Sequence, residues 1–408
     1  MFVVVNVVAN MVLLVRSYVT MQVLDYRELG LAALLQTVVL LVGILQMGVL
    51  NGGYRLLCSA SGDDAQRVNN LVYTVLGLLG AGGLVVTAIA LLFMRGSDAD
   101  VVALLGLVGG LATLGRTWMA NQLIAKHALA VLNRINLVSS VGAVAVLAFV
   151  VFDPFIACLA AVIAQPLIFV VAGAAVDRSL LPTGVEISRP LIRTVLGAGF
   201  VAFLTSMLSL LNVQIERWYI TSWLGLDTLG HFYLALLFVT LFQMVPASLD
   251  QIFLAPVVNA HDRGDGTAVA RILRIFLLLA IGYCVVATVA VAVAARPVLE
   301  FLLPKYLPDL RYVYLVTPGL VMLTLSGPFA LVFSVLIRFR YYFCAYGVGT
   351  VATAAAIAGF VMMGRPLDLS GVVVVRSVSY AVTALLVVAG YALLTRDVPA
   401  LRFGLLRR

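Results

Sequence analysis

Charged residues are scarce in this chain of 408 residues: 11% are Asp, Glu, Lys or Arg, whereas 63% are hydrophobic. The mean hydropathy is +1.13. A soluble domain carries about a quarter charged residues and interrupts its apolar runs with polar ones. The composition therefore excludes a soluble globular protein and indicates an integral membrane protein.

Cysteine and histidine are also rare, with four Cys and three His. The cysteines are too scattered for a disulfide framework, and we interpret them as packing residues. No group of His, Cys, Asp and Glu has the spacing of metal ligands. No glycine-rich loop ends in Lys-Ser or Lys-Thr, so ATP hydrolysis is not expected. We predict neither an enzyme nor a bound cofactor or metal.

Long loops are missing as well. The longest polar breaks, near residues 51–69, 177–194, 255–271 and 296–311, are each shorter than about 20 residues, too short for a catalytic domain. Between the breaks lie apolar segments of about 20 residues, the length that spans a hydrocarbon core of about 30 Å as a helix. Barrel strands would be about 10 residues of alternating polarity. The fold class predicted is an all-α polytopic membrane protein with 12 transmembrane helices, near 1–23, 31–50, 70–94, 101–124, 134–152, 155–176, 195–223, 230–254, 272–295, 312–337, 341–363 and 371–394. The first is a retained helix rather than a signal peptide, because no basic region precedes it.

Lys and Arg are distributed unevenly between the two sides of this predicted bundle. Sixteen of the 26 fall in the breaks after even-numbered segments or in the tail, six fall in the odd-numbered breaks, and four lie inside segments. Cytoplasmic loops collect positive charge, so both termini are predicted to be cytoplasmic. This topology, with anionic membrane lipids as partners, accounts for the net charge of +8 without a nucleic acid.

The chain resembles itself at an offset of about 200 residues, which aligns Leu29-Gly30 with Leu229-Gly230 and Arg16 with Glu216. We predict two six-helix bundles related by a parallel internal repeat: residues 1–180 and 195–395, joined by a cytoplasmic linker at 181–194 and followed by a basic cytoplasmic tail at 396–408. Transporters are often built from repeats, with the substrate site at the repeat interface. The duplication therefore favours a transporter working by alternating access.

Charges inside the apolar segments are the strongest functional signal, because one at a helix centre costs about 2.5 to 3.5 kcal/mol on insertion scales. Four are arginines and one central residue is a carboxylate. In the seventh segment, polar residues recur every three or four positions and form a stripe. The candidate substrate-binding residues are Arg16, Arg116, Arg217, Arg376, Asn6, Asn10, Asn121 and Asn212, and the candidate ion-coupling residue is Glu216.

Two interpretations of these charges remain open. They form structural ion pairs between helices, for example Arg16 with Glu216, or they line a basic cavity for an anionic substrate. The arginine surplus favours the cavity, since planar guanidinium groups bind phosphate oxygens in pairs. Glu216 is then the group that takes up a coupling H⁺ or Na⁺. Asp250, between Pro246 and Pro256, is interpreted as part of an irregular interfacial helix end rather than a substrate contact.

Several short stretches resemble one family across nearly the whole chain. They are LDYRELGL at 24–31, QMGVLNG at 46–52, ERWYI at 216–220, LGHFY at 229–233, the stretch 246–256, and LPKY at 303–306. These signatures are similar to those of the polysaccharide and lipid-linked oligosaccharide flippases, the O-antigen flippase-like family. Its superfamily, the multidrug/oligosaccharidyl-lipid/polysaccharide exporters, also contains the multidrug and toxin extrusion exporters.

The resemblance implies a protein of the bacterial cytoplasmic membrane that flips an undecaprenyl-diphosphate-linked oligosaccharide or polysaccharide precursor to the outer leaflet. It implies that the arginines attract the diphosphate and the asparagines contact sugars. Other glycan-assembly membrane proteins are further expected partners. The alternatives left open are a cation-coupled multidrug exporter of the same architecture, a membrane glycan polymerase or ligase, and an assembly scaffold.

Overall fold

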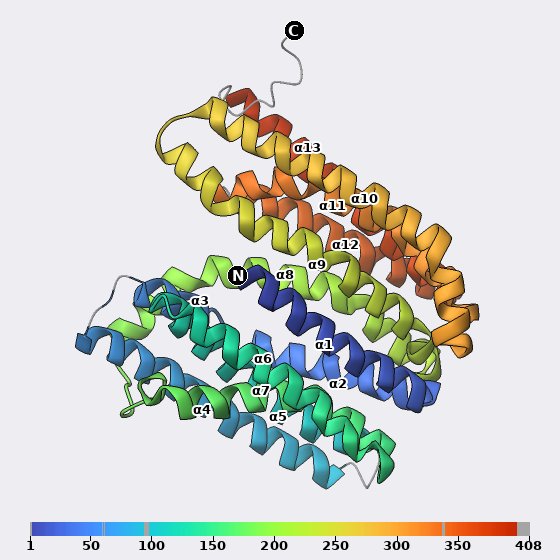
Figure 1. Cartoon of the computed structure of the whole chain (residues 1–408), viewed down its shortest axis with the longest axis horizontal. Coiled ribbons are helices and arrows are strands. Elements are labelled where there is room, and N and C mark those ends of the chain that lie inside the picture. The colour runs from blue at the N-terminus through green and yellow to red at the C-terminus, as the bar shows by residue number, and fades with distance from the viewer. Residues whose placement is uncertain (1, 59, 61, 94–97, 337–338, 398–408) are drawn as a thin grey trace. The chain divides into compact units, whose positions relative to one another are not determined.

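A computed structural model shows the protein to be helical along its length (Figure 1). It describes residues 2–58, 60, 62–93, 98–336 and 339–397, and it leaves out the side chains of some further helical residues, Asn6 and Asn10 among them. Among these residues, ten helices are long and apolar enough to cross a membrane. The chain is thus a multi-pass membrane protein, while the count of 12 spans remains a prediction.

The helices group into two compact units, Met1–Met207 and Leu208–Arg408. The first unit contains α1 (Phe2–Val23), α2 (Tyr26–Ile44), α3 (Val49–Leu57), α4 (Gly62–Phe93), α5 (Asp98–Ala125), α6 (Leu129–Ala145) with the 3-10 turn Val146–Val151, α7 (Pro154–Val176), the 3-10 turn Arg178–Leu180, and the first part of α8 (Arg189–Tyr219). Within it, α1 packs on α6, α2 on α5, and both α5 and α6 on α7.

The second unit contains the end of α8, the π-helical turn Ile220–Leu224, α9 (Leu226–Asp262), α10 (Gly266–Leu302), the 3-10 turn Pro304–Asp309, α11 (Leu310–Val335), α12 (Phe339–Met362) and α13 (Leu369–Asp397). Here α9 packs on α11, and both α11 and α12 pack on α13. α8 therefore runs across the boundary between the units. It begins at Arg189, so the end of the predicted linker is helical.

Local signals in the sequence explain several helix starts. Asp25 begins α2 with a capping box, in which Glu28 N–H donates to its carboxylate at 2.7 Å and its own N–H donates to the Glu28 carboxylate at 3.0 Å. Asp153 accepts from Ile156 N–H at 2.9 Å ahead of Pro154. Each carboxylate satisfies a backbone donor that has no partner within its helix.

The second predicted segment, 31–50, is not one helix: α2 ends at Ile44 and α3 starts at Val49. Met47 and Gly48 have φ values of 46° and 88°, in the left-handed region. α3 then crosses α8 at contact distance within the first unit. A Cβ on Gly52 would lie 1.8 Å from the Val195 carbonyl oxygen, and one on Gly199 would lie 2.1 Å from the Gly48 carbonyl oxygen. The crossing therefore requires glycine at both Gly52 and Gly199.

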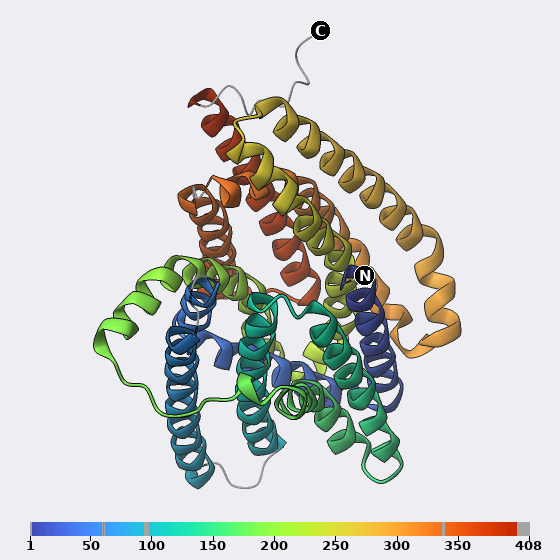
Figure 2. The ribbon, with the colours of Figure 1, turned by 60° about the vertical axis from the view of Figure 1, so that its left-hand side comes forward.

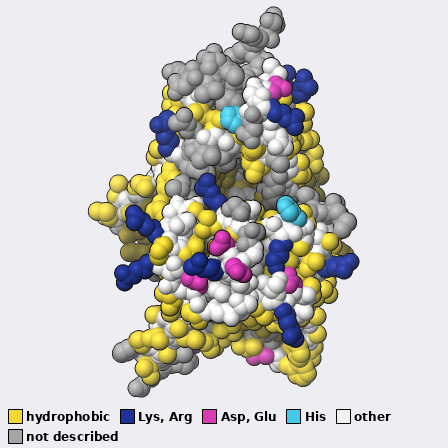
Figure 3. Space-filling model, turned by 90° about the vertical axis from the view of Figure 1, so that its left-hand side faces the viewer, with side chains coloured by type: hydrophobic (Ala, Val, Ile, Leu, Met, Phe, Trp, Pro, Cys, Tyr) yellow, Lys and Arg dark blue, Asp and Glu magenta, His cyan; other side chains and the backbone are white. Residues whose placement is uncertain are grey.

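The segment between α7 and α8 is tied to one end of the first unit (Figure 2). Asn69 of α4 donates to the Leu181 carbonyl at 3.1 Å, and Gln122 of α5 donates to the Leu180 carbonyl at 3.0 Å. The ion pairs Arg67–Glu186 at 3.4 Å and Lys126–Asp177 at 3.2 Å reinforce this docking. The breaks predicted as cytoplasmic thus meet at one end of this unit. Figure 3 shows the left-hand side of Figure 1 from the front, with Lys and Arg side chains spread over it among a few Asp and Glu.

Candidate functional site

Arg376 of α13 is the centre of a buried polar cluster in the second unit. Its guanidinium donates to Asn212 Oδ1 at 2.8 Å, to the Asn212 carbonyl and to Tyr380 Oη at 2.8 Å. It also lies 3.3 Å from a carboxylate oxygen of Glu216 and 4.2 Å from the Tyr380 ring centroid. The side chain is 2% exposed. A charge buried this deeply is tolerated because it is both paired and hydrogen-bonded.

Helix α8 supplies most of the partners of Arg376. Asn212 and Glu216 lie one turn apart and are 5% and 2% exposed. Asn212 also donates from Nδ2 to Thr350 Oγ1 of α12 at 3.1 Å. The predicted polar stripe therefore faces the interior of the second unit, where it joins α12 and α13. Arg217, the next residue along, is also buried, with 8% of its surface exposed.

Arg116 of α5 lies in a different environment, inside the first unit. It donates to Asn136 Oδ1 at 3.4 Å and to Gln165 Oε1 at 3.5 Å, and the ring of Phe169 is 5.5 Å away. These partners are neutral, and no described carboxylate forms an ion pair with it. Arg116 is thus a partly buried guanidinium without a described carboxylate partner, and a guanidinium is not deprotonated in proteins.

The remaining predicted residues are less closely grouped. Arg16 of α1 donates to the Ala161 carbonyl of α7 at 3.4 Å. Asn121 is half-buried on α5. The side chains of Asn6 and Asn10 lie outside the described residues. The structure thus brings together Asn212, Glu216 and Arg376 in the second unit and places Arg16 and Arg116 in the first.

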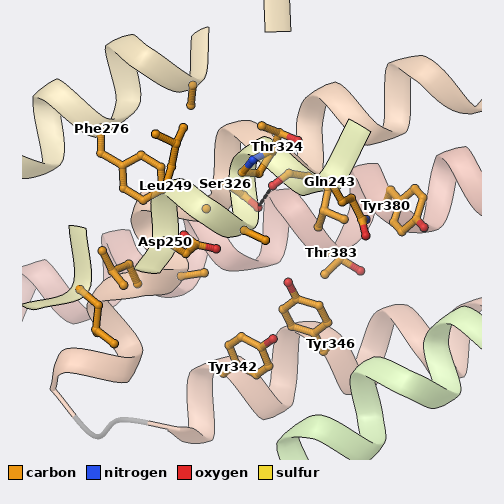
Figure 4. Close-up of a pocket in the computed structure, with 18 of the residues that line it drawn as sticks. Gln243, Leu249, Asp250, Phe276, Thr324, Ser326, Tyr342, Tyr346, Tyr380 and Thr383 are labelled. Carbon is orange, nitrogen blue, oxygen red and sulfur yellow. Dashed lines mark hydrogen bonds between the residues drawn. The ribbon is translucent and has the colours of Figure 1, made fainter. Parts of the chain in front are cut away.

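A pocket of about 480 Å³ opens beside this cluster in the second unit (Figure 4). Asn212 and Tyr380 belong to both. The other polar groups of the lining are Gln243 and Asp250 of α9, Thr324 and Ser326 of α11, Tyr342 and Tyr346 of α12, and Thr383 of α13. This volume falls in the range of small-molecule sites, which combine an apolar lining with a few polar groups.

Asp250 was not expected from the sequence to contact a substrate, but it lines this pocket. It follows Pro246 on α9, and in Figure 4 its carboxylate and the Tyr346 hydroxyl extend into the same space. The interpretation as an interfacial helix end is wrong, because α9 continues to Asp262 and Asp250 lines the pocket. A lone carboxylate in the middle of a long apolar helix was the signal that could have identified it.

No group of three or more His, Cys, Asp or Glu among the described residues is arranged to hold a metal ion.

Comparison with known proteins relates the fold to transporters. No family model matches the chain, and no curated protein matches its sequence. Among solved structures, it is similar to an inward-facing multidrug resistance MATE family transporter of the MOP superfamily, with 12% identity, a TM-score of 0.75, and coverage of 95% of this chain and 94% of the other. It is similar to the lipid II flippase MurJ in an inward closed conformation, with 11% identity, a TM-score of 0.71, and coverage of 98% and 90%.

A third similar structure is a MOP superfamily transporter from Pyrococcus furiosus whose binding pocket is described as having reverse polarity, with 12% identity, a TM-score of 0.67, and coverage of 98% and 94%. The three likenesses extend over nearly the whole chain. The protein is a multi-pass helical membrane protein, and its fold is the one seen in transporters of the MOP superfamily.

Proposed function

We propose that this protein is a transporter that flips an undecaprenyl-diphosphate-linked oligosaccharide or polysaccharide precursor across the bacterial cytoplasmic membrane by alternating access. The fold supports transport, because both multidrug exporters and a lipid flippase share it. The observation that supports an anionic substrate is the environment of Arg116, a guanidinium group whose hydrogen-bond partners inside the first unit are neutral amides.

The packing of the two units supports the predicted parallel repeat of two six-helix bundles. Counting α2 and α3 as one segment, the second, fourth, fifth and sixth segments of the first unit pack in the same order as α9, α11, α12 and α13 of the second. In the second unit, residues at the odd-numbered breaks lie close together. Tyr219 donates to the Leu367 carbonyl at 3.1 Å, and His231 lies 2.9 Å from Asp309. The odd-numbered breaks of this unit thus lie on one side, which fits the predicted topology with both termini in the cytoplasm.

Substrate and coupling ion meet, in this proposal, at the Glu216–Arg376 pair. Protonation of Glu216 removes its negative charge and frees Arg376 to bind a phosphate of the substrate. Arg16, Arg116 and Arg217 add positive charge, and the asparagines Asn6, Asn10, Asn121 and Asn212 supply hydrogen bonds to sugars. The partners are then the lipid-linked glycan, membrane lipids and other glycan-assembly membrane proteins.

The experiment is accumulation of the lipid-linked glycan on the cytoplasmic leaflet after depletion of this protein. Wild type is expected to relieve the accumulation, and Arg116→Gln to fail although inserted normally, because it removes the charge that lacks a carboxylate partner. Arg134→Gln, at an exposed position near the start of α6, is the matched control and should rescue fully. No accumulation on depletion would favour the multidrug exporter or the scaffold, and full rescue by Arg116→Gln would rule out its role.

A further inference from the structure

The pocket of the second unit contains a negative charge that the proposed mechanism does not use. Among the described residues that line it, Asp250 is the only Asp or Glu, and the lining includes no Lys, Arg or His. Asp250 has no hydrogen bond or ion pair with a described residue. A carboxylate held in a largely apolar space needs a counter-charge. Since the described lining supplies none, the ligand is the available source.

Aromatic rings surround the same space. Tyr342 and Tyr346 stack with ring centroids 4.2 Å apart and planes at 15°, and Phe276 stacks on Phe253 at 4.9 Å and 2°. Tyr380 completes the lining next to Asn212. Aromatic faces attract organic cations, and they pack against the apolar C–H faces of a sugar ring. A carboxylate beside tyrosines is thus suited to an ammonium group on an organic body.

The largely apolar lining of the pocket fits an organic ligand better than a bare metal ion. A hard metal ion needs a close cage of six or more oxygen atoms, whereas much of this lining is apolar, including Leu249, Leu254 and Ala280. A volume of about 480 Å³ accommodates a molecule of sugar size. Gln243, Thr324 and Ser326 add polar groups that can bond to hydroxyls.

We infer that this pocket binds a protonated amine carried by the transported glycan, an amino sugar whose nitrogen is not acylated, with Asp250 as its counter-ion and Tyr342, Tyr346 and Tyr380 around it. This inference rests on the proposed function and deepens it, because it names a chemical feature of the glycan. An acylated amino sugar has no charge to pair with Asp250, so the site discriminates between the two.

The test measures binding of glucosamine and N-acetylglucosamine to the purified full-length protein in nanodiscs, by saturation-transfer NMR. Wild type is expected to bind glucosamine at least about tenfold more tightly, a difference of about 1.4 kcal/mol. Asp250→Asn should abolish this preference at nearly constant side-chain volume, and Asp250→Glu should retain most of it. Asp227→Asn, at an exposed position on the same helix, is the matched control and should leave it unchanged.

Three results would overturn the inference: equal binding of the two sugars to wild type, an unchanged preference in Asp250→Asn, or binding of tetramethylammonium that depends on Asp250 while glucosamine does not bind. The last result would assign the pocket to a free organic cation. If Asp250→Asn does not fold, Tyr346→Leu replaces it and should weaken glucosamine binding several-fold. The two proposals can fail separately. The binding assay tests the amine site without the lipid-linked glycan, and the depletion assay tests flipping of that glycan without glucosamine.

Discussion

At the scale of single residues, the Glu216–Arg376 pair is expected to show strong non-additivity. Arg376→Gln leaves the Glu216 carboxylate buried without its ion-pair partner, and breaking such a pair from one side typically costs about 3 to 5 kcal/mol. The double variant Glu216→Gln/Arg376→Gln removes both charges and should unfold at a higher temperature than Arg376→Gln. Thermal unfolding in detergent measures this, and equal losses in the single and double variants would contradict the pairing.

Sequence reasoning identified the polar residues of this cluster but not their partners. Asn212 and Glu216 could be predicted to face inward because they recur one turn apart on an apolar helix. Their contact with Arg376 could not, since it joins α8 to α13 across about 160 residues and depends on how α13 packs. Asp250 was ranked too low for a related reason: the nearby prolines suggested a helix end, whereas α9 passes through them as a helix.

At the scale of helices, the crossing of α3 and α8 is expected to be intolerant of any side chain. Gly199→Ala places a Cβ 2.1 Å from the Gly48 carbonyl oxygen, so the backbones must separate. Overpacking costs about 1 to 3 kcal/mol, and more where backbone must move. Gly197→Ala is the matched control two residues away, where a Cβ meets nothing within 4 Å.

The control change Gly197→Ala should be neutral or stabilising by up to about 1 kcal/mol, because Ala favours a helix over Gly. Unfolding temperatures of the two purified variants measure the difference. Similar values would show that α3 and α8 do not cross at this distance.

The contribution of the docked segment after α7 to the stability of the fold is expected to fall slightly in acid. Hydrogen bonding from the Ser179 side chain holds the pKa of the Asp177 carboxyl below its usual value, and burial opposes this shift. A carboxyl whose pKa is lower in the folded than in the unfolded protein stabilises the fold at pH values above its unfolded-state pKa. This contribution is lost as the pH falls through the folded-state pKa. The group is partly exposed, so the effect should stay below about 1 kcal/mol.

Comparing thermal unfolding of wild type and Asp177→Asn between about pH 6 and pH 3 would show this effect. Wild type should be the more stable at pH 6, and the gap should narrow toward pH 3. A gap that stays constant across this range would mean that ionised Asp177 does not hold the segment.

At the scale of the whole molecule, hydrophobicity made the helices predictable, since nearly every predicted segment coincides with a helix. The break at Met47–Gly48 was missed because its left-handed backbone lies inside an apolar run, beside the close approach of α3 to α8, and hydrophobicity reports neither feature. The pocket was missed because it depends on six helices meeting, α8 to α13. Periodicity predicts which side of a helix faces inward, but not which helices share a cavity.

The predicted orientation of the membrane protein can be tested with its own cysteines. Cys58 and Cys344 are exposed, whereas Cys158 and Cys284 are buried. Cys58 ends the segment that carries Arg55, at the end of the first unit where the basic breaks meet, so it should face the cytoplasm. In a Cys344→Ser background, a membrane-impermeant maleimide should label Cys58 in inverted vesicles and not in intact spheroplasts. Lys305→Cys, combined with Cys58→Ser, should show the reverse, because Lys305 lies in an odd-numbered break. Labelling of Cys58 from outside would reverse the topology, and with it the direction in which the proposed substrate is carried.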